Sequence, residues 1–103
     1  MWYLKPKGGR YHMAFTLTFP YAQAAGVGQG YFVAADPLGP TGIVTVQATV
    51  GNVELRITRY NAPDFIQTVT QGSTFSVQLS NIQTIGIYAL TAVTGTITLI
   101  TPV

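Results

Sequence analysis

The chain has 103 residues, of which only 8% are charged and 48% are hydrophobic, and its formal net charge is +2. This length provides for one domain with one modest core, and the hydrophobic content excludes an intrinsically disordered chain. Cysteine is absent, which excludes disulfides, cysteine–zinc sites and thiol chemistry. Ordinary soluble domains are about 25% charged. We therefore expect much of this uncharged surface to be covered by copies of the same chain.

Residues 1–12 form a basic and aromatic segment ahead of the rest of the chain. Its three cations have no acidic residue beside them, whereas residues 13–103 have a net charge of −1. Aromatic side chains are enriched in interface cores, and so short a segment has no core of its own to bury them. We therefore expect an extended arm that contacts another subunit. The residues expected at this contact are Trp2, Tyr3, Leu4, Lys5, Lys7, Arg10 and Tyr11.

Two strands are expected before the first loop, in residues 13–19 and 30–35. The best helical candidate in the chain is residues 21–25, and the glycines that follow would end it at once. We expect a flexible connector in residues 26–30, because a glycine-rich phosphate loop requires a strand before it and a helix after it. Residues 36–40 are expected to form a loop.

Alternating apolar and polar residues predict strands in the remainder of the chain. Residues 44–50 and 53–58 alternate in this way around Gly51-Asn52, which is typical of a two-residue hairpin turn. Further strands are expected around residues 75–79, 84–87 and 96–99, with turns at 61–64, 71–74, 80–81 and 94–95. Strand starts about every 8–12 residues favour an all-β fold. The predicted fold is a small antiparallel jelly roll or β-sandwich in residues 13–103, with residues 1–12 as its arm.

The uncharged strands also predict sheet edges that join subunits. Monomeric proteins protect their edge strands with Lys, Pro, bulges or inward-pointing charges. Residues 42–50 and 94–101 have high β-propensity and no charge, so in a monomer they would be prone to aggregate. An open edge can instead accept a strand from another chain. The residues expected at such an edge are Val44, Val46, Ile97 and Leu99.

Side chains suited to catalysis or metal binding are few. His12 has no metal ligand near it in the sequence, and Asp36, Glu54 and Asp64 are expected on a loop, an outward strand face and a turn. Solvation and local hydrogen bonds account for these residues. We therefore expect no enzyme, no catalytic site, no cofactor, no metal and no small-molecule substrate.

Nucleic acid and membrane are also not expected as partners. Five basic residues in the whole chain give a weak electrostatic footprint for nucleic acid. Arg56, Arg59 and Tyr60 could touch a phosphate or an aromatic ligand, but a solvated strand face or an intersubunit contact explains them more simply. No apolar run reaches the ~20 residues of a membrane-spanning helix.

Four motifs lie in residues 42–101: GIVTV at 42–46, QTVTQGSTFSV at 67–77, IQTIGI at 82–87 and TGTITL at 94–99. They resemble the endospore appendage (Ena) subunits of spore-forming bacilli, in which a G-x-I-T-V strand precedes a Q-T-V…G-x-S-x-x-x-x-V hairpin and a late I-x-I…G pair. The resemblance implies a jelly-roll subunit that polymerises. It also implies that neighbouring sheets augment one another and that an N-terminal connector, here residues 1–12, reaches into other subunits.

This chain departs from that family in one respect. Family connectors carry cysteines that cross-link the fibre, and this chain has none. Trp2, Tyr3 and Tyr11 would have to anchor the arm by packing, with the arm's cations adding charge contacts.

The favoured function is a self-assembling structural subunit of an extracellular or spore-surface filament, with identical subunits as its partners. We expect assembly without a cleaved signal peptide, because the N-terminus lacks an apolar core and a small-residue cleavage site. One alternative is a virion structural protein, such as a phage decoration, tail or minor capsid protein. The other is a small ligand-binding β-sandwich that uses its aromatic residues and remains a monomer.

Overall fold

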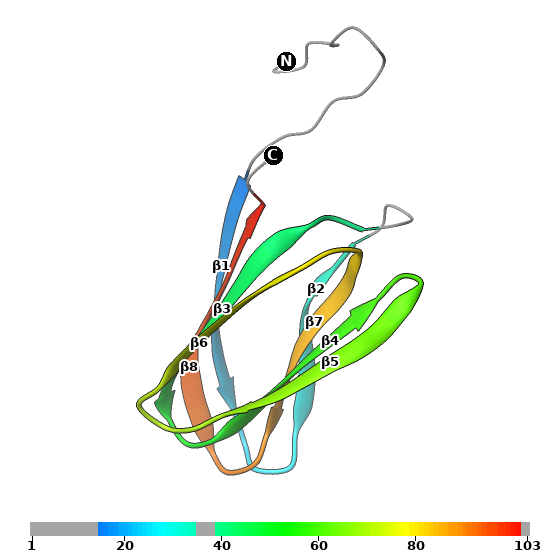
Figure 1. Ribbon diagram of the computed structural model, residues 1–103. Coiled ribbons are helices and arrows are strands. Elements are labelled where there is room, and N and C mark those ends of the chain that lie inside the picture. Colours follow the sequence, from blue (N-terminus) through cyan, green and yellow to red (C-terminus); the bar gives the residue numbers. More distant parts are fainter. Residues whose placement is uncertain (1–14, 35–38, 102–103) are drawn as a thin grey trace, which may run out of the picture.

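The computed structural model describes residues 15–34 and 39–101, and within these ranges every regular element is a β-strand (Figure 1). The all-β prediction is confirmed. The strands are β1 (Phe15–Gln23), β2 (Gly28–Val33), β3 (Gly42–Val50), β4 (Val53–Arg59), β5 (Ala62–Val69), β6 (Thr74–Leu79), β7 (Ile82–Ala89) and β8 (Val93–Thr101). In the described part of the chain there is no helix that could cross a membrane.

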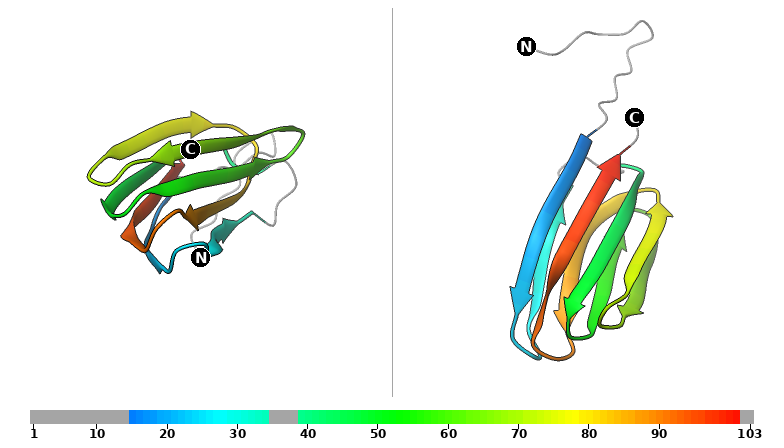
Figure 2. Two further views of the ribbon diagram at one scale, coloured as in Figure 1. Left: turned by 90° about the horizontal axis from the view of Figure 1, so that it is seen from below. Right: turned by 90° about the vertical axis from the view of Figure 1, so that its left-hand side faces the viewer.

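The strands form two four-stranded antiparallel sheets, in the orders β1-β8-β3-β6 and β2-β7-β4-β5. The chain passes from one sheet to the other at every connection except that between β4 and β5. This is the jelly-roll arrangement of a double-sheet sandwich. The two sheets lie face to face as separate layers (Figure 2). The predicted antiparallel jelly roll is therefore confirmed.

The core lies between the two layers and follows from the alternation of each strand, since successive side chains of a strand point to opposite faces. Inward positions of β3, β4, β7 and β8 are completely buried. They are occupied by Val44, Val46, Ala48, Val53, Leu55, Ile57, Ile82, Ile85, Ala89, Ile97 and Leu99, each 0% exposed. Burying one of these Val, Leu or Ile side chains contributes about 1.5–3 kcal/mol.

The predicted hairpin at Gly51-Asn52 is wrong in its pairing, although the chain does turn there. Gly51 has a φ of 79°, which favours glycine. However, β3 pairs with β6 and β8, and β4 pairs with β5 and β7, so the turn carries the chain between sheets. The turn is held by neighbouring loops, since the Gln71 side chain accepts a hydrogen bond from the Gly51 N–H at 2.8 Å.

Three other sequence expectations need correction. The connector expected at 26–30 largely belongs to β2, which starts at Gly28, while β1 continues to Gln23. The turn expected at 61–64 is confined to the start of that range, since β5 begins at Ala62. The turn expected at 94–95 lies earlier in the chain, because β8 begins at Val93.

Gly95 belongs to a strand because the Tyr21 side chain crosses over it. Gly95 pairs with Tyr21 on β1 and with Ala48 on β3. A Cβ atom at Gly95 would collide with the Gln47 carbonyl oxygen and with the Tyr21 ring. The empty position lets the Tyr21 hydroxyl reach across β8 and donate to the Gln47 carbonyl at 3.4 Å.

We predict that Gly95→Ala destabilises the sandwich, whereas Gly30→Ala does not. A Cβ at Gly95 meets backbone and an aromatic ring, but a Cβ at Gly30 meets nothing within 4 Å. Overpacking of this kind costs about 1–3 kcal/mol. Urea unfolding followed by circular dichroism measures the free energy of unfolding. Equal stability of the two variants would contradict the packing assigned to Tyr21.

Candidate assembly surfaces

The four residues expected at a sheet edge lie in the centre of a sheet instead. Val44 and Val46 are on β3, and Ile97 and Leu99 are on β8, the two inner strands of the sheet β1-β8-β3-β6. All four side chains are 0% exposed. The prediction is wrong because a strand without charge can be either central or an unprotected edge. The order of strands in the sheet decides whether such a strand is central or at an edge. That order depends on pairing with segments that are distant in the sequence.

The arm contact expected from the sequence lies outside the described residues. It comprises Trp2, Tyr3, Leu4, Lys5, Lys7, Arg10 and Tyr11. Their role stays a prediction. His12 and Asp36 lie outside these ranges as well. Within 15–34 and 39–101, no group of three or more His, Cys, Asp or Glu side chains is placed to hold a metal ion.

The actual sheet edges are β1, β6, β2 and β5, and three of them carry protective features. Strand β1 contains Pro20, and β5 contains Pro63 and Asp64 near its start. Proline and charge both discourage pairing with another strand. Strand β2 is interrupted by a register shift between Gly30 and Phe32. Such a bulge twists an edge away from a regular partner.

Strand β6 is the edge without these features. Its sequence, TFSVQL, contains neither proline nor charge. Its pairing with β3 runs without a register shift from Gly42↔Leu79 to Gln47↔Thr74. An edge strand presents a row of main-chain N–H and C=O groups that another strand can pair with. Strand β6 is therefore the best-suited strand of this chain for adding a strand from outside.

The sheet that ends in β6 also has an uncharged outer face. One row across its four strands consists of paired hydroxyl residues: Thr18, Thr98, Thr45 and Ser76. The Thr45 and Ser76 hydroxyls are hydrogen-bonded at 2.8 Å. The charged residues of the described ranges all lie on β4 and β5 of the other sheet: Glu54, Arg56, Arg59 and Asp64. Copies that approach through the β6 sheet would meet no like-charge repulsion from it.

Aromatic rings close both open sides of the sandwich. Between β5 and β6, Phe65 and Phe75 stack with ring centroids 6.0 Å apart and an interplanar angle of 18°. Between β1 and β2, the Tyr31 ring lies 6.5 Å from Phe19 and 6.4 Å from Tyr21. Such pairs add to the stability gained from burial. The two layers are therefore joined along their sides by contacts within the subunit.

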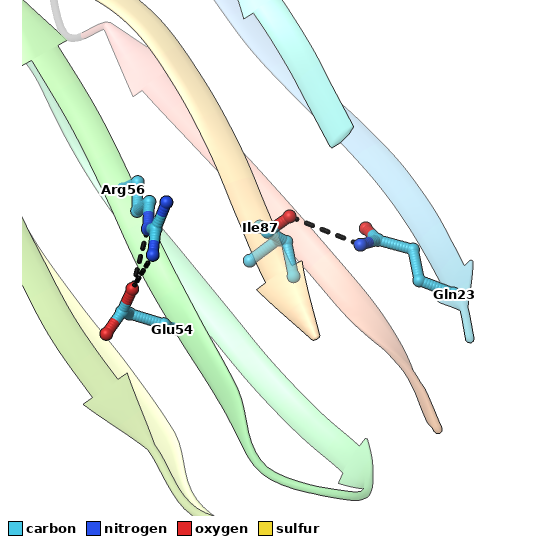
Figure 3. A network of polar contacts seen from close by, with 4 residues as sticks. All are labelled: Gln23, Glu54, Arg56 and Ile87. Carbon is cyan, nitrogen blue, oxygen red and sulfur yellow. Dashed lines mark hydrogen bonds and ion pairs between the residues drawn. The ribbon is translucent and has the colours of Figure 1, made fainter. Parts of the chain in front are cut away.

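A buried glutamine fixes the corner between β1, β2 and β7. Gln23 is 8% exposed. Its Nε2 donates to the Val27 and Ile87 carbonyls at 2.7 and 3.2 Å, and the Tyr31 hydroxyl donates to its Oε1 at 2.7 Å. Figure 3 shows the Gln23 side chain directed at the Ile87 carbonyl. Sequence analysis missed this residue, although Gln23 continues the inward alternation of Phe19 and Tyr21.

Burial raises the pKa of both tyrosines at this corner. The pKa of Tyr21 lies above its ordinary value of 10.0, chiefly because burial removes water from the hydroxyl and secondly because of the charge on Tyr31. Desolvation likewise raises the pKa of Tyr31 above 10.0. Both hydroxyls therefore stay protonated, and able to donate, to a higher pH than in the unfolded chain.

Arg56, Arg59 and Tyr60 do not converge on one ligand. The Arg56 Nε donates to Glu54 at 2.6 Å. The Arg59 Nε donates to the Ser80 carbonyl at 2.9 Å, and the Tyr60 hydroxyl donates to the Ala34 carbonyl at 2.7 Å. Each side chain has a separate partner, so the three do not form a phosphate site.

Several solved structures share this fold. A protein of Bacillus endospore appendages, described as a family of disulfide-linked pili, superposes with a TM-score of 0.69 at 14% identity over 88% of each chain. An RmlC-like cupin protein from Desulfovibrio desulfuricans has a TM-score of 0.57 at 14% identity, over 91% of this chain and 79% of that one. A conserved Streptococcus pyogenes protein of unknown function has a TM-score of 0.52 at 17% identity, over 88% of this chain and 76% of that one.

No protein-family model and no curated protein sequence matches this chain. At these identities the likeness to solved structures establishes the jelly-roll fold. One fold can host many unrelated functions, so function has to be argued from this chain's own surfaces.

We predict that the free energy of unfolding falls as the pH rises above about 10, and that Tyr31→Phe weakens this fall. A raised folded-state pKa gives stability that is complete below the unfolded-state pKa and is lost as the pH rises through the folded-state pKa. At neutral pH, Tyr31→Phe should cost about 1–3 kcal/mol, because the Gln23 Oε1 loses its donor. Denaturant unfolding between pH 7 and 11 measures both effects. A variant with wild-type stability throughout this range would contradict the role given to Tyr31.

Proposed function

We propose that this protein is a structural subunit that assembles with identical copies into a filament outside the cell or on a spore surface. Sheet augmentation at β6 joins neighbouring subunits, and residues 1–12 add a second contact as an arm. The subunit has no catalytic role in this proposal. The sandwich domain comprises residues 13–103.

The observation that carries the proposal is the unprotected edge of β6 in a fold shared with an endospore pilus protein. That likeness extends over 88% of both chains. The edge offers a regular backbone for pairing, and the face beside it carries no charged side chain. Free edges of this kind are a hazard for a monomer and a joining surface for a polymer. The low charge of the whole chain has the same explanation, since a covered surface needs little charge for solubility.

The arm would act at a different place from the edge. Phe15 at the start of β1 pairs with Thr101 at the end of β8, so β1 begins and β8 ends at the same pole of the sandwich (Figure 1). Strand β6 runs along the side of the sandwich. The two contacts can therefore be removed one at a time.

A filament also has to form without cross-links. The pili of the structural neighbour are described as disulfide-linked, whereas this chain has no cysteine. Its subunits would be held by backbone pairing and by packing alone. Reducing agents should therefore leave this filament intact.

Negative-stain electron microscopy of the purified protein tests the proposal. We expect regular filaments from the full chain and fewer or shorter filaments from a chain that starts at Met13. We also expect few or no filaments from Thr74→Lys combined with Gln78→Lys, because lysines on an edge strand oppose pairing. Both positions are exposed on β6, so the fold should survive the change.

The matched control places two lysines at the same spacing on a central strand. Thr94 and Thr98 lie on β8, which is hydrogen-bonded on both sides. Thr94→Lys combined with Thr98→Lys adds the same charge and should still form filaments. Discrete monomers from the full chain would overturn the proposal and would favour a virion protein that assembles only on a capsid, or a ligand-binding module.

A further inference from the structure

The outer face of the other sheet contains a shallow hollow of about 230 Å³ over β2, β7 and β4. Gly30 and Gly86, which are paired across β2 and β7, leave its floor without side chains. The hollow is also lined by Arg56, Tyr88 and Thr58. Pockets for drug-sized ligands span about 300–1,000 Å³, so this hollow has room for a single ring.

Gly30 is not required by the fold. Its φ does not lie in the left-handed region, and a Cβ at this position would meet nothing within 4 Å. By contrast, a Cβ at Gly86 would approach the Gln29 carbonyl oxygen to 3.0 Å. Glycine inside a strand weakens it, and it often marks a site where a ligand or another backbone comes close. The open position at Gly30 therefore keeps the hollow accessible at a cost in strand stability.

Arg56 is held in place at the rim of the hollow. Its guanidinium lies 4.7 Å from the centre of the Tyr88 ring, and its Nε donates to Glu54 Oε1 at 2.6 Å (Figure 3). A guanidinium has five N–H donors, of which this carboxylate engages only some. The Arg56 side chain is 52% exposed. The rim thus offers fixed donors whose positive charge is already neutralised by Glu54.

Hydroxyl groups complete the polar part of the rim. Thr58 and Thr84 lie on adjacent strands, and their hydroxyl oxygens are 2.5 Å apart. Each hydroxyl can donate one hydrogen bond and accept others. The Glu54–Arg56 ion pair has no net charge, and it and two paired hydroxyls lie beside a floor of glycine backbone. This arrangement suits a compact ring that carries many hydroxyls. Because Glu54 neutralises Arg56, the site offers no net positive charge to attract a strongly anionic ligand.

We propose that this hollow binds one ring of a neutral sugar. The ring would rest on the backbone of Gly30 and Gly86. Its hydroxyls would accept hydrogen bonds from Arg56, and they would donate to or accept from the hydroxyls of Thr58 and Thr84. This inference does not rest on the filament proposal. Edge pairing extends a sheet within its own plane and leaves its faces open, so the hollow would be accessible in a monomer and in a filament.

Saturation-transfer-difference NMR on the full chain tests this site. The probes are the methyl glycosides of glucose, galactose and mannose, together with N-acetylglucosamine. The method observes the small ligand, so it applies to a monomer and to an assembly. We expect saturation transfer to at least one of these sugars. Arg56→Ala should weaken its binding roughly ten- to a hundredfold, the range for losing hydrogen bonds to a charged group.

Gly30→Val gives the sharpest test, because it fills the hollow without disturbing the strand. The site of the added side chain is open, and β-branched residues favour strands. We expect binding to be lost while thermal unfolding stays at or above the wild-type temperature. The matched control is Val33→Thr on the same strand. Val33 is 70% exposed and lies outside the hollow, so this change should leave binding unchanged.

Three results would overturn the inference. They are the absence of saturation transfer to every sugar tested, binding that survives in both Gly30→Val and Arg56→Ala, and binding of glucuronate in preference to the neutral sugars. If Gly30→Val fails to fold, Arg56→Ala alone decides the second outcome, because the Arg56 side chain is half exposed and outside the core. The first and third outcomes need only the unchanged chain.

Discussion

Backbone hydrogen bonding at the end of a sheet is the constraint on which the proposed assembly of this protein depends. Each sheet of the sandwich must stop at two edge strands, and each edge leaves main-chain donors and acceptors facing outward. Three of the four edges carry a proline, a charge or a bulge. Strand β6 carries none of these and pairs with β3 in unbroken register. Among the described strands, β6 is therefore the edge that stays regular, and in the proposed assembly a second copy pairs with it.

The interior of the sandwich makes this open edge compatible with a stable subunit. Strands β3, β4, β7 and β8 supply the core, and aromatic pairs close the two open sides. Gln23 and Tyr31 satisfy each other's polar groups at the corner of β1 and β2. In the described residues, no buried side-chain nitrogen or oxygen lacks a hydrogen-bond partner. The described sandwich therefore satisfies its buried polar groups by itself, and the proposed assembly would use its surface.

The fold class could be predicted from the sequence because it depends on local periodicity. Apolar residues recur every second position in segments such as 44–50 and 53–58, and these segments are strands. The pairing partners could not be predicted in this way. Residues on either side of Gly51 look like a hairpin, yet they enter different sheets, since strand order is set by contacts between distant segments. The same limit explains why Val44 and Ile97 were expected at an edge.

The surfaces proposed for function depend on the same distant contacts. Gly30, Gly86 and Arg56 are far apart in sequence, and only the pairing of β2, β7 and β4 brings them around one hollow. In the sequence Gly30 is only the last glycine of the connector expected at 26–30, and nothing in the sequence identifies the residues that surround it in the hollow. Likewise, TFSVQL becomes an edge only because β6 is the last strand of its sheet. The arm in residues 1–12 was inferred from composition and from a family resemblance, and its contact remains a proposal.

Hydrogen–deuterium exchange of the assembled protein, compared with the dissociated subunit, tests the central claim most directly. Main-chain amides of an exposed edge exchange readily, and they become protected when another strand pairs with them. We predict that protection on assembly is greatest in Thr74–Leu79. The central strands β3 and β8 should change little, because they are already paired on both sides. Unchanged exchange in β6, together with new protection elsewhere, would contradict this claim.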